Sequence, residues 1–297
     1  MTRLRDWLAN PWGKPRVLVL FTALYLVWSI VPILIAIRFS FNDGRSRSTA
    51  QGWSLRWYTE DPDLSVLHDP ALSSALLQSL RLSAIAVLVT VLLGVALAIG
   101  LTRWRGRGAG TSRAVSLATL VTPEIVMGTA LLLVFVHLLT FVQLGTVAQA
   151  IGHITFSLVF VLIIVRGRLL AIGPQYEEAA RDLGASRLQA IRLALLPMLV
   201  PAVVASGIIV FAISMDDFVI SAFLSSGTST DTVPVRIYST GRTAPTPALN
   251  ALATLTLALT IVIALVGFLL WRAVRAARGQ TGSTVGEFAA LDAESIR

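Results

Sequence analysis

Long apolar stretches alternate with short polar ones along most of this 297-residue chain. A helix needs about 20 apolar residues to cross the hydrocarbon core of a bilayer. Stretches of about that length occupy residues 16–37, 83–101, 115–139, 147–165, 193–213 and 251–271. The pattern therefore predicts an all-α, polytopic membrane protein with six transmembrane helices. No small-residue cleavage site follows the first stretch, which indicates an uncleaved anchor rather than a signal peptide.

The basic residues are concentrated in alternate loops. They precede the first span and follow the second, fourth and sixth, in segments 3–16, 103–113, 166–192 and 272–278. The other loops hold fewer basic residues, and the largest of them balances its arginines with acids. Because short cytoplasmic loops retain Lys and Arg during insertion, we expect both termini in the cytoplasm, together with the loop between the fourth and fifth spans.

The spans divide the chain into three parts. We expect a cytoplasmic N-terminal segment at residues 1–15, a transmembrane domain at 16–272 and a cytoplasmic tail at 273–297. The tail mixes Gly, Ser, Thr and acidic residues without apolar periodicity, so it is predicted to be flexible. The cytoplasmic loop at residues 175–197 is too long for a simple turn and is the most informative segment of the chain.

Composition supports the membrane assignment and excludes several kinds of site. Hydrophobic residues make up 55% of the chain and charged residues 13%, with a mean hydropathy of +0.78, unlike an ordinary soluble domain. The net charge of +8 comes from the loop clusters, so nucleic acid is not an expected partner. Without cysteine, disulfides and thiolate metal sites are excluded. The three histidines lack a second ligand at helical spacing, so no metal site is predicted.

The loop at 175–197 begins with a pattern typical of a short amphipathic helix. Tyr176, Ala179, Ala180 and Leu183 fall on one side of it. Gly184 is expected to end this helix, and a second helix is expected over residues 185–191. The small alanines permit close approach by a partner protein. A helix resting on lipid headgroups is the alternative interpretation.

The order of residues in this loop resembles the Glu-Ala-Ala (EAA) loop of ABC importer permeases. Glu178 is followed by two alanines, then by a glycine at 184 and a Leu-Pro pair ending at Pro197. Ala194 stands where the family usually has a larger aliphatic residue. The resemblance implies the fold of a type I ABC importer permease, with the loop seated in a cleft of a cytoplasmic ATPase. It implies coupling roles for Glu178, Ala179, Ala180, Gly184, Ala185 and Pro197.

The resemblance also implies the partners of this chain. Lys14, the only lysine, lies in Gly-Lys-Pro and cannot form a phosphate loop. The chain is therefore expected not to be an enzyme and to bind no cofactor, with ATP and magnesium held by two partner ATPase subunits. A second homologous permease, a periplasmic or extracellular polyamine-binding protein and the lipid bilayer complete the expected partners.

Beyond the loop, residues 39–270 look most similar to the permeases of spermidine/putrescine importers, which implies polyamine as the transported substrate. Ionisable groups at membrane depth usually mark a pathway or a partner. Asp216 and Asp217 end the fifth span, and Glu124 is expected in the inner half of the third. Carboxylates and an aromatic face suit ammonium groups. The candidate pathway residues are Trp57, Glu124, Ser214, Asp216 and Asp217.

Other interpretations of these residues and of the whole chain stay open at this stage. The aspartates also suit a helix cap, Trp57 an interfacial belt, and Ser214 a bond to its own backbone. Within the same class, the runner-up is an importer of another small solute such as thiamine, ferric ion or an aminophosphonate. A stand-alone channel or secondary carrier is a rival of another class, and a membrane enzyme is disfavoured because no nucleophile–base pair is found.

Overall fold

The computed structural model describes residues 16–46, 49–104, 106–243 and 246–277, and every regular element within them is a helix. Segment 1–15 and residues 278–297 of the predicted tail lie outside the described residues, whereas residues 273–277 of that tail belong to the last helix. The elements are α2 (Arg16–Ser40), η1 (Arg56–Glu60), α3 (Pro70–Arg103), α4 (Ala109–Val121), α5 (Glu124–Leu133), η2 (Val134–Leu138), α6 (Thr146–Ile172), α7 (Gln175–Asp182), α8 (Arg187–Gln189), η3 (Ala190–Leu195), α9 (Leu196–Asp216), α10 (Val219–Leu224), η4 (Thr228–Thr230), α11 (Val233–Thr243) and α12 (Pro247–Ala277).

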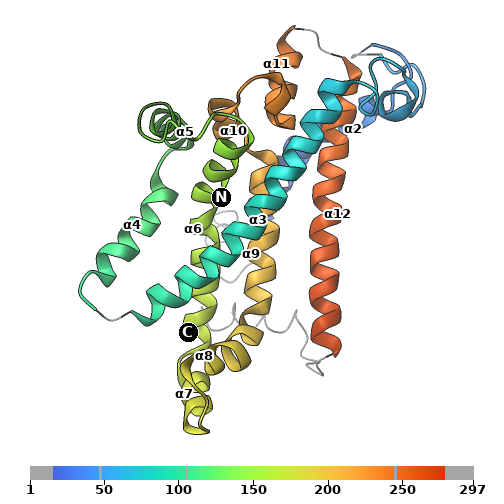
Figure 1. The fold of residues 1–297 in the computed structure, drawn as a ribbon. Coiled ribbons are helices and arrows are strands. Elements are labelled where there is room, and N and C mark those ends of the chain that lie inside the picture. Colours follow the sequence, from blue (N-terminus) through green and yellow to red (C-terminus); the bar gives the residue numbers. More distant parts are fainter. Residues whose placement is uncertain (1–15, 47–48, 105, 244–245, 278–297) are drawn as a thin grey trace, which may run out of the picture.

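Three long helices, α3, α6 and α9, pack together to form the centre of the bundle (Figure 1). Their shared core is aliphatic and includes Val161, Leu169 and Leu199, all fully buried. Helix α12 packs against α9 and α2. Figure 1 places α7 and α8 at one end of the bundle, and α5, α10 and α11 at the other.

Five helices of the described part are long and apolar enough to cross a membrane, and a bent pair makes a possible sixth. Helix α3 extends well before the predicted start of the second span at residue 83, because its polar residues there are buried rather than in a loop. Asp69 caps the helix by accepting the N–H of Ala71 at 2.7 Å. Ser79 accepts the backbone N–H of Val233 at 2.9 Å.

The prediction that the third span is one continuous helix is wrong. Residues 115–139 are divided between α4 and the α5–η2 segment, which meet at an angle of 107°. The break lies at Thr122 and Pro123, which both adopt extended backbone. A residue before proline is driven out of the helical region by the proline ring, and this explains the position of the bend.

The end of the bundle opposite α7 carries a separate apolar cluster around η1. Trp57 is fully buried there against Val66, Val233 and Leu252. Its indole N–H donates to the carbonyl of Asn42 at 2.6 Å. The long loop after α2 is therefore fixed to α11 and α12 by a folded core.

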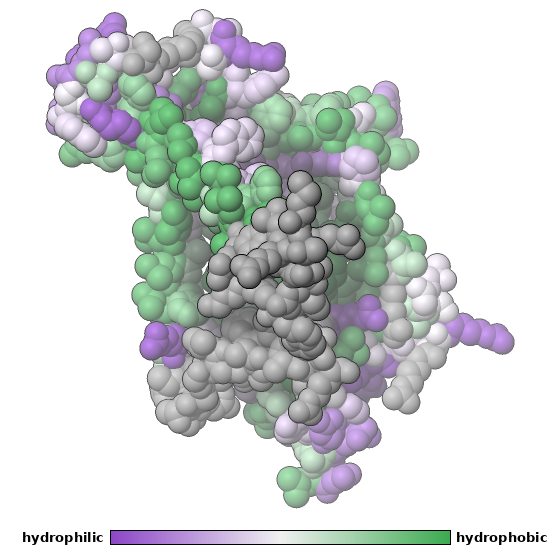
Figure 2. Space-filling view, turned by 180° about the vertical axis from the view of Figure 1, so that it is seen from behind, coloured by the Kyte–Doolittle hydropathy of each residue, from purple (hydrophilic) through white to green (hydrophobic). Residues whose placement is uncertain are grey.

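The surface is consistent with a lipid environment. Figure 2 shows apolar side chains over the middle height of one face and hydrophilic ones gathered toward its ends. None of the most apolar 18-residue window of α2 is buried inside the chain. In water such a helix would expose large apolar area, whereas in a bilayer its outward apolar face is favourable.

Candidate functional site

The α7–α8 hairpin is held together by backbone bonds at its turn. Gly184 has φ +89°, a left-handed conformation that glycine adopts without strain. Its N–H donates to the carbonyl of Arg181 at 2.9 Å, and the N–H of Ala185 donates to that of Ala180 at 3.1 Å. This pair of bonds is a Schellman motif, which ends a helix and reverses the chain. The predicted termination at Gly184 is therefore confirmed.

The second helix begins slightly later than predicted. Ser186 is its N-cap, and a reciprocal capping box joins it to Gln189. The helix does not stop at residue 191 but continues through the π-helical turn η3 into α9. Pro197, which has no N–H to donate, is the second residue of α9, one residue after that turn ends.

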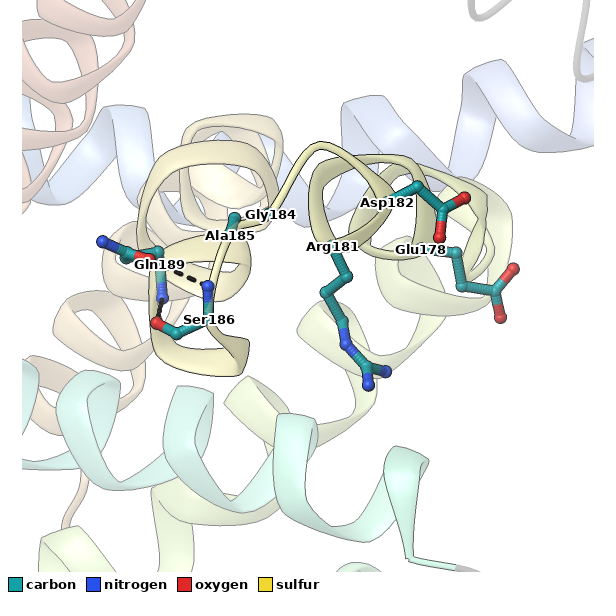
Figure 3. A pocket seen from close by; sticks show the side chains of 7 residues that line it. All are labelled: Glu178, Arg181, Asp182, Gly184, Ala185, Ser186 and Gln189. Carbon is teal, nitrogen blue, oxygen red and sulfur yellow. Dashed lines mark hydrogen bonds between the residues drawn. The ribbon is translucent and has the colours of Figure 1, made fainter.

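Five of the six predicted coupling residues lie around the tip of this hairpin, and Pro197 does not. Figure 3 shows Glu178 and Asp182 on the same side of α7, while Arg181 points away from them. These side chains and those of the following turn line an open hollow of about 510 Å³. Glu178, Ala179 and Gly184 are exposed, Ala180 and Ala185 are half-buried, and Pro197 is exposed farther along the chain.

An ion pair connects the hairpin to the central bundle. The guanidinium of Arg103, the last residue of α3, contacts the carboxylate of Glu177 on α7. Both side chains are largely buried, and Arg103 and Glu177 line a second hollow of about 420 Å³ together with Arg187. Helix α7 is therefore joined to α3 as well as to the helix that follows it.

The other candidate residues lie at the opposite end of the bundle. Asp217 follows α9 and caps the short helix α10. Its Oδ2 accepts the N–H and the O–H of Ser221, both at 2.8 Å, and its Oδ1 accepts the N–H of Ile220 at 3.3 Å. Asp217 is buried, whereas its neighbour Asp216 is exposed. The two aspartates thus differ in burial and in hydrogen bonding, a difference that their adjacent positions in the sequence do not predict.

His153 of α6 lies at the centre of this polar group. Its Nδ1 lies 2.7 Å from Oγ of Ser214, and its Nε2 lies 2.9 Å from Oγ of Ser221 and 3.2 Å from Oδ2 of Asp217. The carboxyl of Glu124, at the start of α5, interacts with Asp217. We call Glu124, His153, Ser214, Asp217 and Ser221 the polar cluster. Glu124 was expected in the inner half of its span, but the bend at Pro123 places it here, at the end away from α7.

Close packing around α10 brings the polar cluster together. A Cβ added to Gly152 of α6 would lie 2.6 Å from Ile220 and 2.8 Å from Leu224. Glycine therefore permits α10 to approach α6 directly beside His153. Gln149, fully buried, donates to the carbonyls of Ser221 and Thr230 and holds the chain after α9 in place.

Trp57 is not part of the polar cluster. It lies in the apolar cluster around η1, and Arg56 stacks on its ring at 5.3 Å. The aromatic pair nearest in sequence to the aspartates is instead Phe218 with Tyr238, whose centroids are 4.8 Å apart. Ser221 was also missed, although its position four residues after Asp217 is the spacing of a capped helical turn. Among the described residues, no group of three His, Asp or Glu is arranged to hold a metal ion.

A bundle of apolar helices with an exposed helical hairpin at one end is the architecture expected of a membrane transport protein. The chain belongs to the family described as the binding-protein-dependent transport system inner membrane component, whose sequence model matches residues 90–278. It is accordingly a multi-pass inner-membrane permease subunit of an ABC importer, and such a subunit is not itself catalytic.

Several named relatives are similar over most of the chain. The putrescine transport system permease protein PotI of Escherichia coli K12 is 35% identical, covering 88% of this chain and 90% of PotI. The spermidine/putrescine transport system permease protein PotC of the same strain is 35% identical, covering 88% and 95%. PotC of Haemophilus influenzae is 33% identical, covering 82% and 91%.

Solved structures confirm the fold. A chain of a bacterial ABC transporter involved in the import of the acidic polysaccharide alginate superposes with a TM-score of 0.70 at 17% identity, covering 91% of this chain and 96% of that one. A chain of an amino acid ABC transporter gives 0.52 at 22% identity, covering 70% and 96%. At these identities the similarity shows the fold of ABC importer permeases and nothing about the transported solute.

Proposed function

We propose that this permease carries polyamines such as putrescine and spermidine into the cell, as one of two homologous permeases in an ATP-driven importer. Two ATPase subunits, which bind ATP and magnesium, and a polyamine-binding protein outside the membrane complete the assembly. Both termini and the α7–α8 hairpin face the cytoplasm in this proposal. The printed names of three relatives at 33–35% identity support the substrate.

The observation that carries the coupling role is the exposed tip of the α7–α8 hairpin. Glu178 and Gly184 border the open hollow there, and the Schellman turn gives the tip a defined shape. An exposed acidic side chain beside small residues suits insertion into a cleft of a partner protein. Closure of the ATPases on ATP would move this tip, and α9, which is continuous with α8, would move with it.

The acidic residues at the other end support a cationic substrate. Glu124 and Asp217 interact, and Asp216 is exposed close by in the chain. Ammonium groups are favoured by carboxylates in a region of low dielectric, and Ser214 offers a hydroxyl beside them. We include these four residues in the proposed pathway. Trp57 is left out because its ring belongs to the separate apolar cluster around η1 and its indole N–H is already donated to Asn42.

The coupling proposal is tested by Glu178→Lys in the complete importer reconstituted in liposomes. Uptake of labelled putrescine is expected to fall to background, because the charge at the contact with the ATPase is reversed, while the amount of inserted permease stays unchanged. Since the chain has no cysteine, single cysteines at Ala180 and Ala185 give clean crosslinking sites. Normal uptake by Glu178→Lys, or no crosslink to the ATPase from either site, would refute the proposal.

The substrate is tested separately by competition. Labelled putrescine uptake is expected to be inhibited by excess spermidine and to be unaffected by thiamine, ferric ion or an aminophosphonate. Inhibition by one of these three solutes alone would identify a different importer with the same coupling mechanism. Flux of putrescine through this chain reconstituted by itself would instead indicate a channel or secondary carrier.

A further inference from the structure

His153 is the one histidine of the described residues that is buried within the polar cluster, and its ring bridges three helices. It projects from α6 and contacts Ser214 on α9 and Ser221 on α10. Only 2% of the residue is exposed. A polar ring enclosed to this degree needs partners for both nitrogens, because an unsatisfied buried group is costly.

The hydrogen bonds around His153 determine which nitrogen donates. The O–H of Ser221 is already donated to Asp217, so the Oγ of Ser221 has only lone pairs to offer the ring. Nε2 must therefore carry a proton and donate toward Ser221 and Asp217. Nδ1 is then free to accept the O–H of Ser214. This arrangement gives both ring nitrogens a partner, and the donor role of Nε2 follows from the network.

The contacts of Asp217 are unevenly divided between its two oxygens. Oδ2 accepts the N–H and the O–H of Ser221, both at 2.8 Å, and lies 3.2 Å from Nε2 of His153. Oδ1 receives one longer contact, from the N–H of Ile220 at 3.3 Å. Oδ2 is thus held by protein donors, whereas Oδ1 accepts one long backbone hydrogen bond. The carboxyl of Glu124 is hydrogen-bonded to Asp217, so the two acidic side chains form a pair.

We propose that His153 is a positioning residue that fixes Asp217 through Nε2, so that the second oxygen of Asp217 and the carboxyl of Glu124 receive the ammonium groups of the passing substrate. The inference rests on the proposed function, because it assigns a purpose to the same acidic pair. It adds that the histidine acts through the aspartate and does not itself touch the substrate.

Two amide substitutions distinguish the two ring nitrogens. In His153→Gln the amide nitrogen lies near the position of Nε2 and retains a donor for Asp217. In His153→Asn the shorter side chain reaches only the position of Nδ1 and retains the contact with Ser214. Both variants are polar and remove the ring, so their general effects on folding are matched. His137 on η2, which is exposed, provides the control variant His137→Asn.

The measurement is the number of putrescine molecules transported per ATP hydrolysed, made on the complete importer with saturating binding protein. We expect His153→Asn to lower this ratio about tenfold, the size expected for one hydrogen bond to a charged group. His153→Gln should stay within about threefold of the wild type, and His137→Asn should match it. ATP hydrolysis stimulated by the binding protein should be retained in all three variants.

The outcomes separate this inference from the proposed function. If the wild type does not transport putrescine, the proposed function fails and the inference falls with it. If the wild type transports putrescine but the Gln and Asn variants lower the ratio equally, the positioning role alone is overturned. Loss of transport and ATP hydrolysis together in both variants would indicate a purely structural histidine and would also overturn it.

Discussion

The α7–α8 hairpin and the polar cluster lie at opposite ends of the bundle and are built in opposite ways. The hairpin is closed by bonds between residues three to five apart in the chain, such as Ala185 to Ala180. The polar cluster joins His153 to Ser214 and Ser221, which are 61 and 68 residues away. The first can keep its shape while the helices move, whereas the second exists only while α6, α9 and α10 are packed together.

Of the substitutions that test this difference, Asp217→Ala is expected to have the largest effect. The substitution leaves two backbone N–H groups, the hydroxyl of Ser221 and the ring of His153 without their acceptor. We expect a loss of stability of roughly 3 kcal/mol, because several buried donors are stranded at once. Thermal unfolding of the purified permease in detergent measures it. Asp216→Ala, one position earlier and exposed, should leave the unfolding temperature unchanged, and equal shifts would show that burial in the cluster has no energetic weight.

A smaller effect is expected at the turn of the hairpin. The Cβ added by Gly184→Ala would meet no atom within 4 Å. The expected loss of stability, about 1 to 2 kcal/mol, therefore comes from the left-handed backbone alone. Uptake should fall because the turn changes shape, while the rest of the bundle keeps its stability. Gly241→Ala is the matched control, since its added Cβ also meets nothing and its backbone is helical. Reduced uptake in both variants would point to a cause other than backbone conformation.

The smallest effect should come from the ion pair that joins the two kinds of structure. Arg103→Glu or Glu177→Arg places like charges together and should weaken coupling by about 1 kcal/mol, the upper end of the range for surface ion pairs, because this pair is largely buried. The double variant restores opposite charges and should recover most of the uptake per ATP hydrolysed. If the double variant is no better than either single one, α3 is not linked to α7 through this contact.

The contrast between local contacts in the hairpin and long-range contacts in the polar cluster explains which features could be predicted from the sequence. The end of α7 at Gly184 and the reversal toward Pro197 follow from local chemistry, and both were predicted. The start of α3 was not, because the apolar stretch was read from residue 83, whereas the polar Gln78 and Ser79 before it have buried partners in α6 and α11. Gln78, for example, donates to Gln149 at 2.8 Å.

The polar cluster was only half predicted for a related reason. Charge at membrane depth singled out Glu124, Asp216 and Asp217, since such residues are rare there. Nothing in the order of residues paired His153 with Asp217, because their meeting depends on how α6 and α9 are packed. The bend before Glu124 had a local signal in Pro123, but a continuous apolar stretch outweighed it.

The length of α3 has a consequence for the lipid as well as for the protein. Its 34 residues extend about 51 Å, while the hydrocarbon core is about 30 Å thick and the whole bilayer 40–45 Å. A helix of this length that stayed within the bilayer would have to cross obliquely, with Arg103 near one of the headgroup layers. A thinner or thicker membrane would change that tilt and shift the anchored end of α7. If the α7–α8 hairpin couples to the ATPases as proposed, acyl-chain length is expected to tune how strongly nucleotide hydrolysis is transmitted to the transport pathway.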